Sequence, residues 1–98
     1  MLGQRIVCKK LDRDAAEALA LQGLAWLAGN AEELGAFLAQ AGMDASQLQR
    51  SAGSPEVLAG VMDYLLADET RLLAFCAAAE CDPALPARAR LPLPGGEA

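Results

Sequence analysis

Residues 26–44 read WLAGNAEELGAFLAQAGMD, and residues 64–82 read YLLADETRLLAFCAAAECD. Each stretch begins with an aromatic residue and a Leu, continues through an Asn or Asp and a Leu-x-x-Phe pair, and ends on Asp, at an offset of 38 residues. One amphipathic helix hairpin cannot bury its own apolar face, whereas two copies can cover each other. The repeated residues are folding signals, so we predict a pseudo-duplicated helical unit that serves as a scaffold.

The composition of the whole chain favours helices. Of the 98 residues, 54% are hydrophobic but only 4% are aromatic, so Leu and Ala, two strong helix formers, must supply most of the core. β-Branched and aromatic residues, which favour strands, are scarce. A chain of this length suffices for one small domain with a single core. We predict an all-α protein, a compact bundle of about five to six short helices.

Helix start and stop signals recur along the chain. An N-cap residue precedes each apolar run, and a Gly or a polar residue follows it. Asp14 with Glu17 resembles a capping box and predicts a helix that ends near Ala28. Later helix starts are predicted at Asn30, Asp44, Ser54-Pro55, Asp68-Glu69 and Asp82-Pro83. The last helix should span one to two turns, because Pro86 follows closely.

Charge and composition divide the chain into three parts. Residues 1–12 form a basic arm that we expect to be flexible, either solvated or in contact with an acidic partner or a lipid surface. Residues 13–91 form the single helical domain, and residues 92–98 form a disordered tail rich in Pro and Gly. The net charge is −5 and the helical body is acidic, which argues against nucleic acid as a partner.

Further patterns narrow the class of function. No segment approaches the roughly eighteen uncharged apolar residues that a membrane span requires, and the start does not read as a signal peptide. The three Cys residues include no Cys-x-x-Cys pair, which suits a reducing compartment, so we expect a cytoplasmic protein. The chain has no His and no glycine-rich phosphate loop. We therefore predict no catalytic residue, no cofactor and no metal site.

Four residues are candidates for contacts with a partner. Asp63 is a lone carboxylate within an apolar helical run, where it either binds a partner or marks the outer face of the helix. Trp26 and Tyr64 hold corresponding positions of the echo, which favours equivalent packing, although aromatic residues are also enriched at interfaces. Glu80 stands where the first copy has Gly42. The asymmetric positions, Asp63 and Glu80, are the better places to look for function.

Other reactive groups have simpler explanations. Cys76 and Cys81 stand where the first copy has Leu38 and Met43, so we interpret them as packing residues rather than as a redox pair. Seven other carboxylates fall at caps or in first helical turns, where the helix dipole favours negative charge: Glu32, Glu33, Asp44, Glu56, Asp68, Glu69 and Asp82. This placement argues against acid–base catalysis or cation binding by these carboxylates.

Two predicted helical stretches, residues 15–28 and 72–79, lack an obvious polar face. A helix that is apolar all round is central in its bundle or is covered by another subunit. Gly23 lies in the middle of the first stretch, where Gly costs about 1 kcal/mol relative to Ala, which indicates close approach of a neighbouring backbone. A homodimer would supply a second layer of burial.

Six short runs carry a resemblance to a known family. They are Glu17–Ala20, Trp26–Ala28, Leu34–Leu38, Gly42–Asp44, Pro55–Leu58 and Met62–Glu69. In order and spacing they resemble a small alphaproteobacterial family of helical proteins classed as a domain of unknown function, number thirty-five seventy-two. The resemblance implies a compact, all-helical, cytosolic protein with no catalytic residue or cofactor to carry over. Glu80 departs from the pattern, because a left-handed helix cap is costly for Glu.

Three functions from different classes follow. The first is a protein–protein interaction or self-associating module without catalytic activity, which would offer an apolar helical face to a protein partner or a second copy. The alternative is a small-molecule binder or an enzyme that uses a carboxylate such as Asp63. The third is nucleic-acid binding by a pair of helices, which the acidic body opposes.

Overall fold

Helices make up the regular structure between residues 12 and 96, the part of the chain that the computed structural model describes. They are α2 (Arg13–Ala28), α3 (Ala31–Ala41), α4 (Ala45–Ser51), α5 (Pro55–Leu66), α6 (Glu69–Ala79) and α7 (Leu85–Arg90). This part of the chain contains six helices and no strand, so the prediction of an all-α bundle is confirmed. Of the arm predicted over residues 1–12, all but Asp12 lies outside the described residues.

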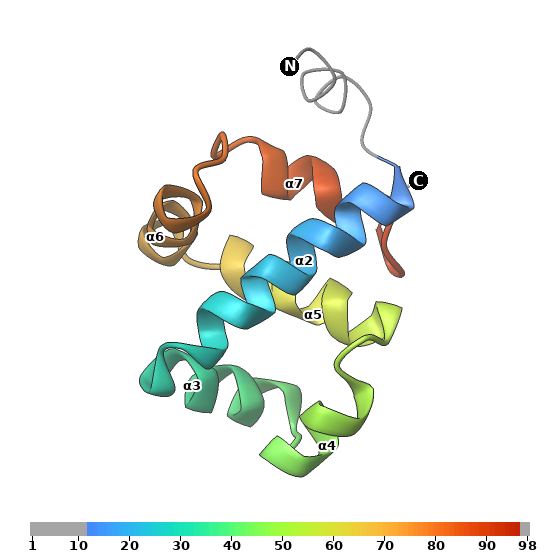
Figure 1. Cartoon of the computed structure of the whole chain (residues 1–98), viewed down its shortest axis with the longest axis vertical. Coiled ribbons are helices and arrows are strands. Elements are labelled where there is room, and N and C mark those ends of the chain that lie inside the picture. The colour runs from blue at the N-terminus through green and yellow to red at the C-terminus, as the bar shows by residue number, and fades with distance from the viewer. Residues whose placement is uncertain (1–11, 97–98) are drawn as a thin grey trace.

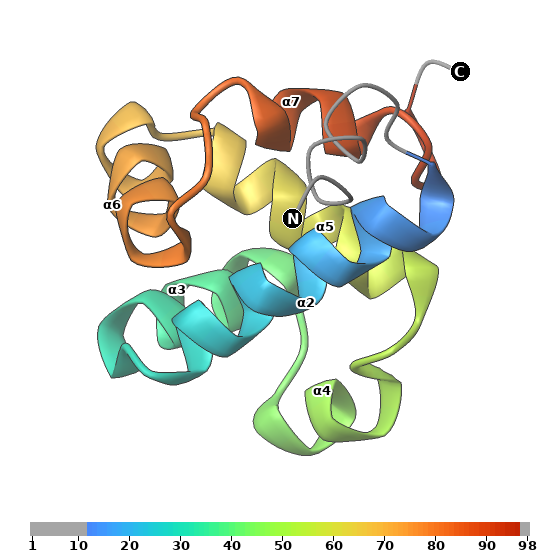
Figure 2. The same ribbon diagram turned by 45° about the horizontal axis from the view of Figure 1, so that its top comes forward.

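The two longest helices, α2 and α5, lie in the middle of the molecule (Figure 1). α3 and α4 lie at one end, and α6 and α7 lie at the other (Figure 1). α2 packs mainly on α5 and also contacts α7, α3 and α6. α4 stands at the edge and contributes one buried side chain, Leu48 (Figure 2). The contacts of α2 with four helices bury Ala16, Leu19, Ala20, Gly23 and Leu27, whereas Ala18, Leu21, Ala25 and Ala28 leave an apolar face exposed.

The predicted capping signals operate at several helix starts. Asp44 and Gln47 form a reciprocal capping box, with N···O distances of 2.8 and 2.9 Å. The side chains of Ser54 and Asp68 each accept a hydrogen bond from the backbone N–H three residues further on. These bonds satisfy amide groups that the first turn of a helix leaves without a backbone partner.

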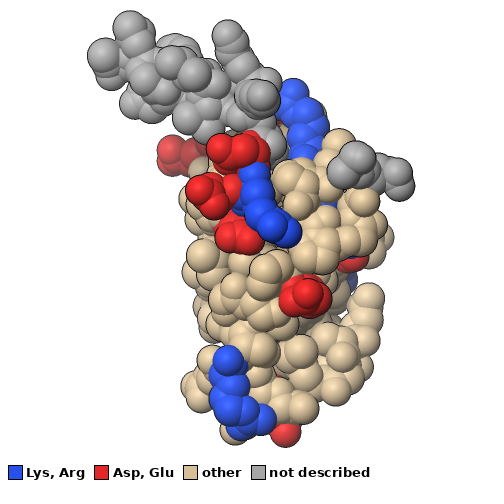
Figure 3. Space-filling view, turned by 90° about the vertical axis from the view of Figure 1, so that its right-hand side faces the viewer, with Lys and Arg blue, Asp and Glu red and all other residues tan. Residues whose placement is uncertain are grey.

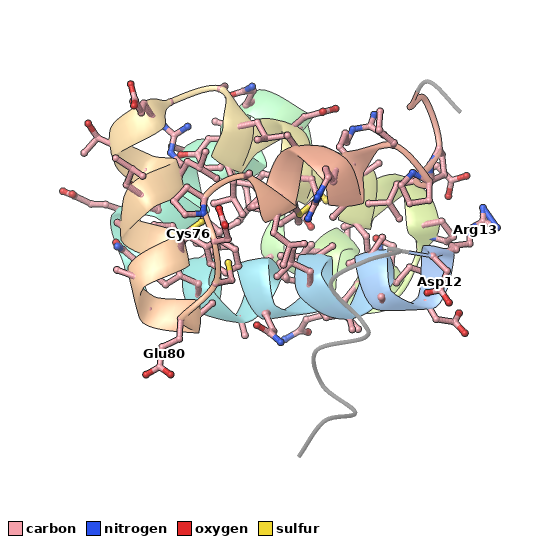
Figure 4. All side chains as sticks on the ribbon, turned by 90° about the horizontal axis from the view of Figure 1, so that it is seen from above. Asp12, Arg13, Cys76 and Glu80 are labelled. Atoms are coloured by element: carbon pink, nitrogen blue, oxygen red, sulfur yellow. The ribbon has the colours of Figure 1, made fainter. Side chains whose placement is uncertain are left out.

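The first helix starts earlier than predicted. Its N-cap is Asp12 and not Asp14, because the Asp12 carboxylate accepts a 2.9 Å hydrogen bond from the N–H of Ala15. Asp12 and Arg13 lie at the beginning of α2, at the end of the molecule opposite Glu80 (Figure 4). Asp14 is instead an acidic residue of the first turn, which the helix dipole also favours.

The last helix was also placed incorrectly by the sequence signals. α7 begins at Leu85, and Asp82 caps a turn before it by accepting a 2.8 Å hydrogen bond from the N–H of Ala84. Pro86 lies in the first turn of α7 rather than interrupting the helix. A first-turn N–H has no backbone partner in any case, so its absence from Pro costs little.

The core consists of apolar side chains from the central helices and from α6. The largest fully buried side chains include Leu27, Leu58, Val61, Met62, Leu65 and Phe75. A Cβ atom added to Gly23 would lie 2.9 Å from Leu65 Cδ1 and 3.1 Å from Val61 Cγ1. The close approach predicted at Gly23 is therefore made by α5, through its side chains rather than its backbone.

The chain remains packed beyond the end of α7. The Arg90 guanidinium donates hydrogen bonds of 3.3 and 2.8 Å to the carbonyl oxygens of Leu93 and Pro94. Leu93 is 2% exposed and belongs to the core. The boundary expected at residue 91 thus falls inside a packed segment, because the alternation of Pro with Leu hides a buried side chain among turn-forming residues.

Candidate interaction grooves

Two pairs of aromatic rings connect the two corresponding stretches, residues 26–44 (the first half) and 64–82 (the second half). The rings of Trp26 and Phe75 meet edge to face, with centroids 6.2 Å apart and planes at 68°. The rings of Tyr64 and Phe37 do the same, at 5.5 Å and 66°. Trp26 corresponds to Tyr64, and Phe37 to Phe75. Trp26 of the first half therefore contacts the Phe of the second half, and Tyr64 of the second half contacts the Phe of the first. This exchange is the pattern expected of two units related by a two-fold axis.

Two open grooves lie beside these ring pairs. The α2–α6 groove, of about 330 Å³, is lined by Gln22, Ala25, Trp26, Phe75, Ala78 and Ala79. The α3–α5 groove, of about 220 Å³, is lined by Gly60, Asp63, Tyr64, Phe37, Gln40 and Ala41. When the two lists are matched position by position, each residue of one groove is separated by 38 positions in the sequence from its counterpart in the other. A duplicated unit would give this relation; the duplication itself stays a prediction.

The two grooves differ in chemistry although their positions correspond. The α2–α6 groove has Ala25 and Ala78 where the α3–α5 groove has Asp63 and Gln40. An amide lines each groove, Gln22 in the first and Gln40 in the second, but only the second is also lined by a charged side chain, Asp63. The α2–α6 groove is therefore suited to uncharged, mainly apolar groups, and the α3–α5 groove to groups that also pair with a carboxylate.

A polar cluster beneath the α3–α5 groove joins three helices. The Tyr64 hydroxyl donates a 2.7 Å hydrogen bond to Glu33 Oε1, and Arg71 Nε donates one of 3.1 Å to the same oxygen. Arg71 Nη1 also donates to the Tyr64 carbonyl oxygen at 2.7 Å. The Arg71 guanidinium carbon lies 3.8 Å from the centroid of the Tyr64 ring, within the range of a cation–π contact.

The environment of Tyr64 identifies it chiefly as a core residue. Its side chain is 3% exposed. Burial and the hydrogen bond to the Glu33 carboxylate raise the pKa of its phenol above the usual 10.0, against the opposing effect of the Arg71 charge. The phenol is therefore neutral at physiological pH and holds Glu33 in place. Trp26 is more accessible, because it is only partly buried at the α2–α6 groove.

Asp63 lies at the α3–α5 groove with its charge already paired. Arg90 holds its two carboxylate oxygens with N···O distances of 2.7 and 3.2 Å. The Asp63 side chain is 60% exposed, whereas that of Arg90 is 16% exposed. The pair joins α5 to α7 and to the segment after it, so Asp63 has a structural contact besides its exposed position.

Glu80 ends α6 with a left-handed backbone, at φ 57°. Gly42 ends α3 in the same region, at φ 71°. In both places the next N–H reaches back to a helix carbonyl at 3.0 Å, from Met43 to Leu38 and from Cys81 to Cys76. The Glu80 side chain points to solvent, while Cys76 lies on the inner side of α6 (Figure 4). Glu80 therefore adopts the costly cap conformation that its counterpart Gly adopts freely.

The helix end that Glu80 caps also brings the two described thiols together. Cys76 is 3% exposed, and Cys81 packs partly buried against the core. Burial and the neighbouring Cys76 raise the pKa of the Cys81 thiol from 9.0 to about 11. Little thiolate is present at neutral pH, which agrees with packing roles rather than nucleophilic ones.

Charged side chains cover only a small part of one face of the molecule. On the face shown in Figure 3, they gather mainly where α2 begins and near α4, and most of the surface between is uncharged. Among residues 12–96, no group of three or more Cys, Asp and Glu is placed to hold a metal ion. No helix in this range is long and apolar enough to cross a membrane.

Comparison with known proteins identifies the family. Residues 13–96 match the model of the family described as Protein of unknown function (DUF3572). The chain belongs to this family. The match confirms the family resemblance of the sequence, and it also includes the packed segment after α7. No curated protein and no solved structure matches the chain.

Sequence reasoning missed several polar residues that the DUF3572 fold brings together. Glu33 was interpreted only as a first-turn acid, and neither Arg71 nor Arg90 was a candidate. One signal was available, because Arg71 is a lone cation in an apolar helix and stands 38 residues after Glu33. The structure does not bring the four candidate residues into one site: Asp63 and Tyr64 line one groove, Trp26 lines the other, and Glu80 ends α6.

Proposed function

We propose that this protein is a non-catalytic interaction module whose α2–α6 groove binds apolar side chains from a basic, amphipathic segment of a protein partner. The groove itself is the observation that supports the proposal. It is lined by six uncharged residues, two of them aromatic. Aromatic rings provide large apolar contact area, and such residues are enriched at interfaces.

The surface next to this groove extends its apolar character. On α2 the exposed residues Ala18, Leu21, Ala25 and Ala28 are three or four residues apart and share one face. Leu21 is 46% exposed and is the large apolar side chain of this strip; Leu73 and Leu91 are exposed to a similar extent elsewhere. An apolar strip continuous with a groove is typical of a surface that meets another protein segment.

The charge of the domain favours a basic partner. Residues 12–96 contain twelve Asp and Glu but five Arg. Three of these Arg residues pair with acids: Arg13 with Glu17, Arg71 with Glu33, and Arg90 with Asp63. The remaining negative field attracts a basic segment and repels an acidic one, while the uncharged groove provides contacts for its apolar side chains.

A defined peptide tests this proposal. The probe is a synthetic amphipathic helix of Leu and Lys, and the control peptide has Ser in place of every Leu. Binding should shift the NMR signals of the Trp26 indole N–H and the Ala25 and Ala78 methyl groups, and only the Leu peptide should do so. Ala78→Lys should abolish the shifts, whereas Gln40→Lys, the same charge at the corresponding position of the other groove, should preserve them.

The opposite pattern would refute the proposal. Equal weakening by Ala78→Lys and Gln40→Lys would mean that the peptide responds to the net charge of the domain and not to the groove. Shifts caused equally by the Ser peptide would lead to the same conclusion.

Self-association through the same face is a separate prediction. The exposed Leu21 side chain would lie at such an interface. Light scattering at micromolar concentration should then give the mass of a dimer, and Leu21→Arg should reduce it to that of a monomer. A monomeric mass for the unaltered chain would exclude the homodimer.

A small-molecule binder is the second candidate, favoured by the side chains at the α3–α5 groove. The exposed Asp63 carboxylate and the Gln40 amide line this groove beside the Tyr64 and Phe37 rings. Aromatic rings with a carboxylate suit a small aromatic amine. Such amines should raise the melting temperature of the unaltered chain and raise that of Asp63→Asn less. An unchanged melting temperature would argue against this candidate.

A further inference from the structure

The N-terminal segment has the chemistry that the α2–α6 groove would select. Residues 1–11 read MLGQRIVCKKL. The large aliphatic side chains of Leu2, Ile6, Val7 and Leu11 alternate with basic Arg5, Lys9 and Lys10, and the segment has no acid. It is therefore a basic, amphipathic segment attached to an acidic domain.

The segment is long enough to reach this groove from where it joins α2. Gln22 and Trp26 line the groove ten and fourteen residues after Asp12, which is about 15–21 Å along the helix axis. Eleven residues span at most about 36 Å when extended. About half of this length is needed to return along α2, which leaves several residues to occupy the groove.

We infer that residues 1–11 of the same chain occupy the α2–α6 groove and compete there with a partner segment. The inference rests on the proposed function of this groove and assigns its regulation. A short covalent connection gives an effective concentration in the millimolar range, which favours docking within one chain over docking between copies.

Two features select the α2–α6 groove over its counterpart. The α3–α5 groove is smaller, about 220 Å³ against about 330 Å³, and its carboxylate is already paired with Arg90. No acidic residue lines the α2–α6 groove, so no carboxylate there is held by an Arg. Ile6 or Val7 would enter the groove, while Lys9 and Lys10, three and two residues before Asp12, would stay near the start of α2.

A spin label at Cys8 tests the docking in the full chain. Cys81→Ala leaves Cys8 and the buried Cys76, so the label attaches to Cys8. Signal broadening is expected at Ala25, Trp26 and Ala78, but not at Gly60 and Gln40 of the other groove. At a concentration where light scattering gives a monomeric mass, a mixture of labelled chain and isotope-enriched unlabelled chain should show no broadening.

Broadening at the α3–α5 groove, at neither groove, or in the mixed sample would overturn the inference. The last result would mean that the segment docks on a second copy.

A binding measurement separates this inference from the proposed function. Ile6→Asp with Val7→Asp should release the groove, so the Leu and Lys peptide should bind about tenfold more tightly if the segment occupies the groove about nine-tenths of the time. Gln4→Asp with Gly3→Asp is the control with the same change in charge, and it should change the affinity much less. Peptide binding of equal affinity in all variants would refute autoinhibition while leaving the groove as an interaction site. The absence of peptide binding in every variant would refute the proposed function.

Discussion

Glu80 shows how a single residue can be held in a conformation that its side chain disfavours. Its φ of 57° repeats the geometry of Gly42, and the backbone hydrogen bond from Cys81 to Cys76 keeps the helix end closed. A residue with a Cβ atom pays about 1–2 kcal/mol for this conformation. The fold accepts this cost because Cys81 and the chain after it must turn toward the core at this point.

Glu80→Gly should stabilise the protein by about 1 kcal/mol, because Gly adopts a left-handed backbone without strain. Gly42→Glu is the matched control at the corresponding helix end and should destabilise it by a similar amount. Urea unfolding followed by circular dichroism measures both changes as opposite shifts of the midpoint. If Glu80→Gly instead lowers the urea midpoint, the Glu80 carboxylate must make a stabilising contact.

Cys81 should make the stability of the domain depend on alkaline pH. Its thiol has a pKa raised to about 11 in the folded protein and 9.0 as the ordinary value. The folded state therefore binds the thiol proton more tightly, so this contribution is complete below pH 9 and is lost as the pH rises from 9 to 11. Tyr64, whose pKa is raised above 10.0, adds a loss of the same sign at higher pH.

Melting temperatures measured between pH 8 and 11 should fall less steeply for Cys81→Ala than for the unaltered chain. Both proteins retain Tyr64, so the difference between the two curves isolates the thiol. Parallel curves would contradict the burial of Cys81.

At the scale of the element, α2 and α5 approach closely because α2 has a Gly at the contact. A Cβ atom added to Gly23 would lie only 2.9 Å from Leu65 Cδ1. Leu65 is fully buried and has little freedom to move away. Helix propensity and packing therefore act in opposite directions at this residue, and packing determines the outcome.

Gly23→Ala should destabilise the protein by about 1–3 kcal/mol through overpacking between α2 and α5. Gly35→Ala, in the middle of α3 with no atom within 4 Å of an added Cβ, should stabilise it by about 0.5–1 kcal/mol. Chemical unfolding of both variants gives the comparison. Equal stabilisation by the two substitutions would contradict the close contact of the central helices.

At the scale of the whole molecule, Arg71 links the two halves. It pairs with Glu33 of α3 while sitting on α6, and it lies over the ring of Tyr64 from α5. Glu33 and Arg71 correspond to each other in the echo, so their contact would lie on the axis that relates the halves. Removing this side chain breaks contacts among three helices at once.

Arg71→Ala should destabilise the domain by about 2–3 kcal/mol, because it leaves Glu33 without its cation and the Tyr64 carbonyl without its donor. Arg50→Ala is the control, since Arg50 is exposed on the peripheral α4, and it should change the stability by less than about 0.5 kcal/mol. Thermal and urea unfolding measure both variants. Equal small losses would show that the cluster contributes little to the packing of the halves.

The sequence predicted the helical fold well because its signals are local. The capping residues Asp44, Ser54 and Asp68 act on amides three residues away, so a short window contains the whole interaction. The errors at Asp12 and Leu85 arose where two acids or two Pro residues compete for the same role within a few positions. The burial of Leu93 escaped prediction because it stands between two Pro residues, in a segment whose composition is typical of a disordered tail.

The sequence by itself determined the helices, most of their ends, the acidic charge and the correspondence between two stretches of chain. The tertiary structure alone decided that Trp26 and Phe75 form one groove, that Tyr64 is buried, and that Asp63 is paired with Arg90. The physical reason is the distance along the sequence between the residues that make each kind of contact. Helix caps join neighbours, whereas the decisive polar contacts join residues 27 to 38 positions apart, and these meet only when whole helix faces pack together.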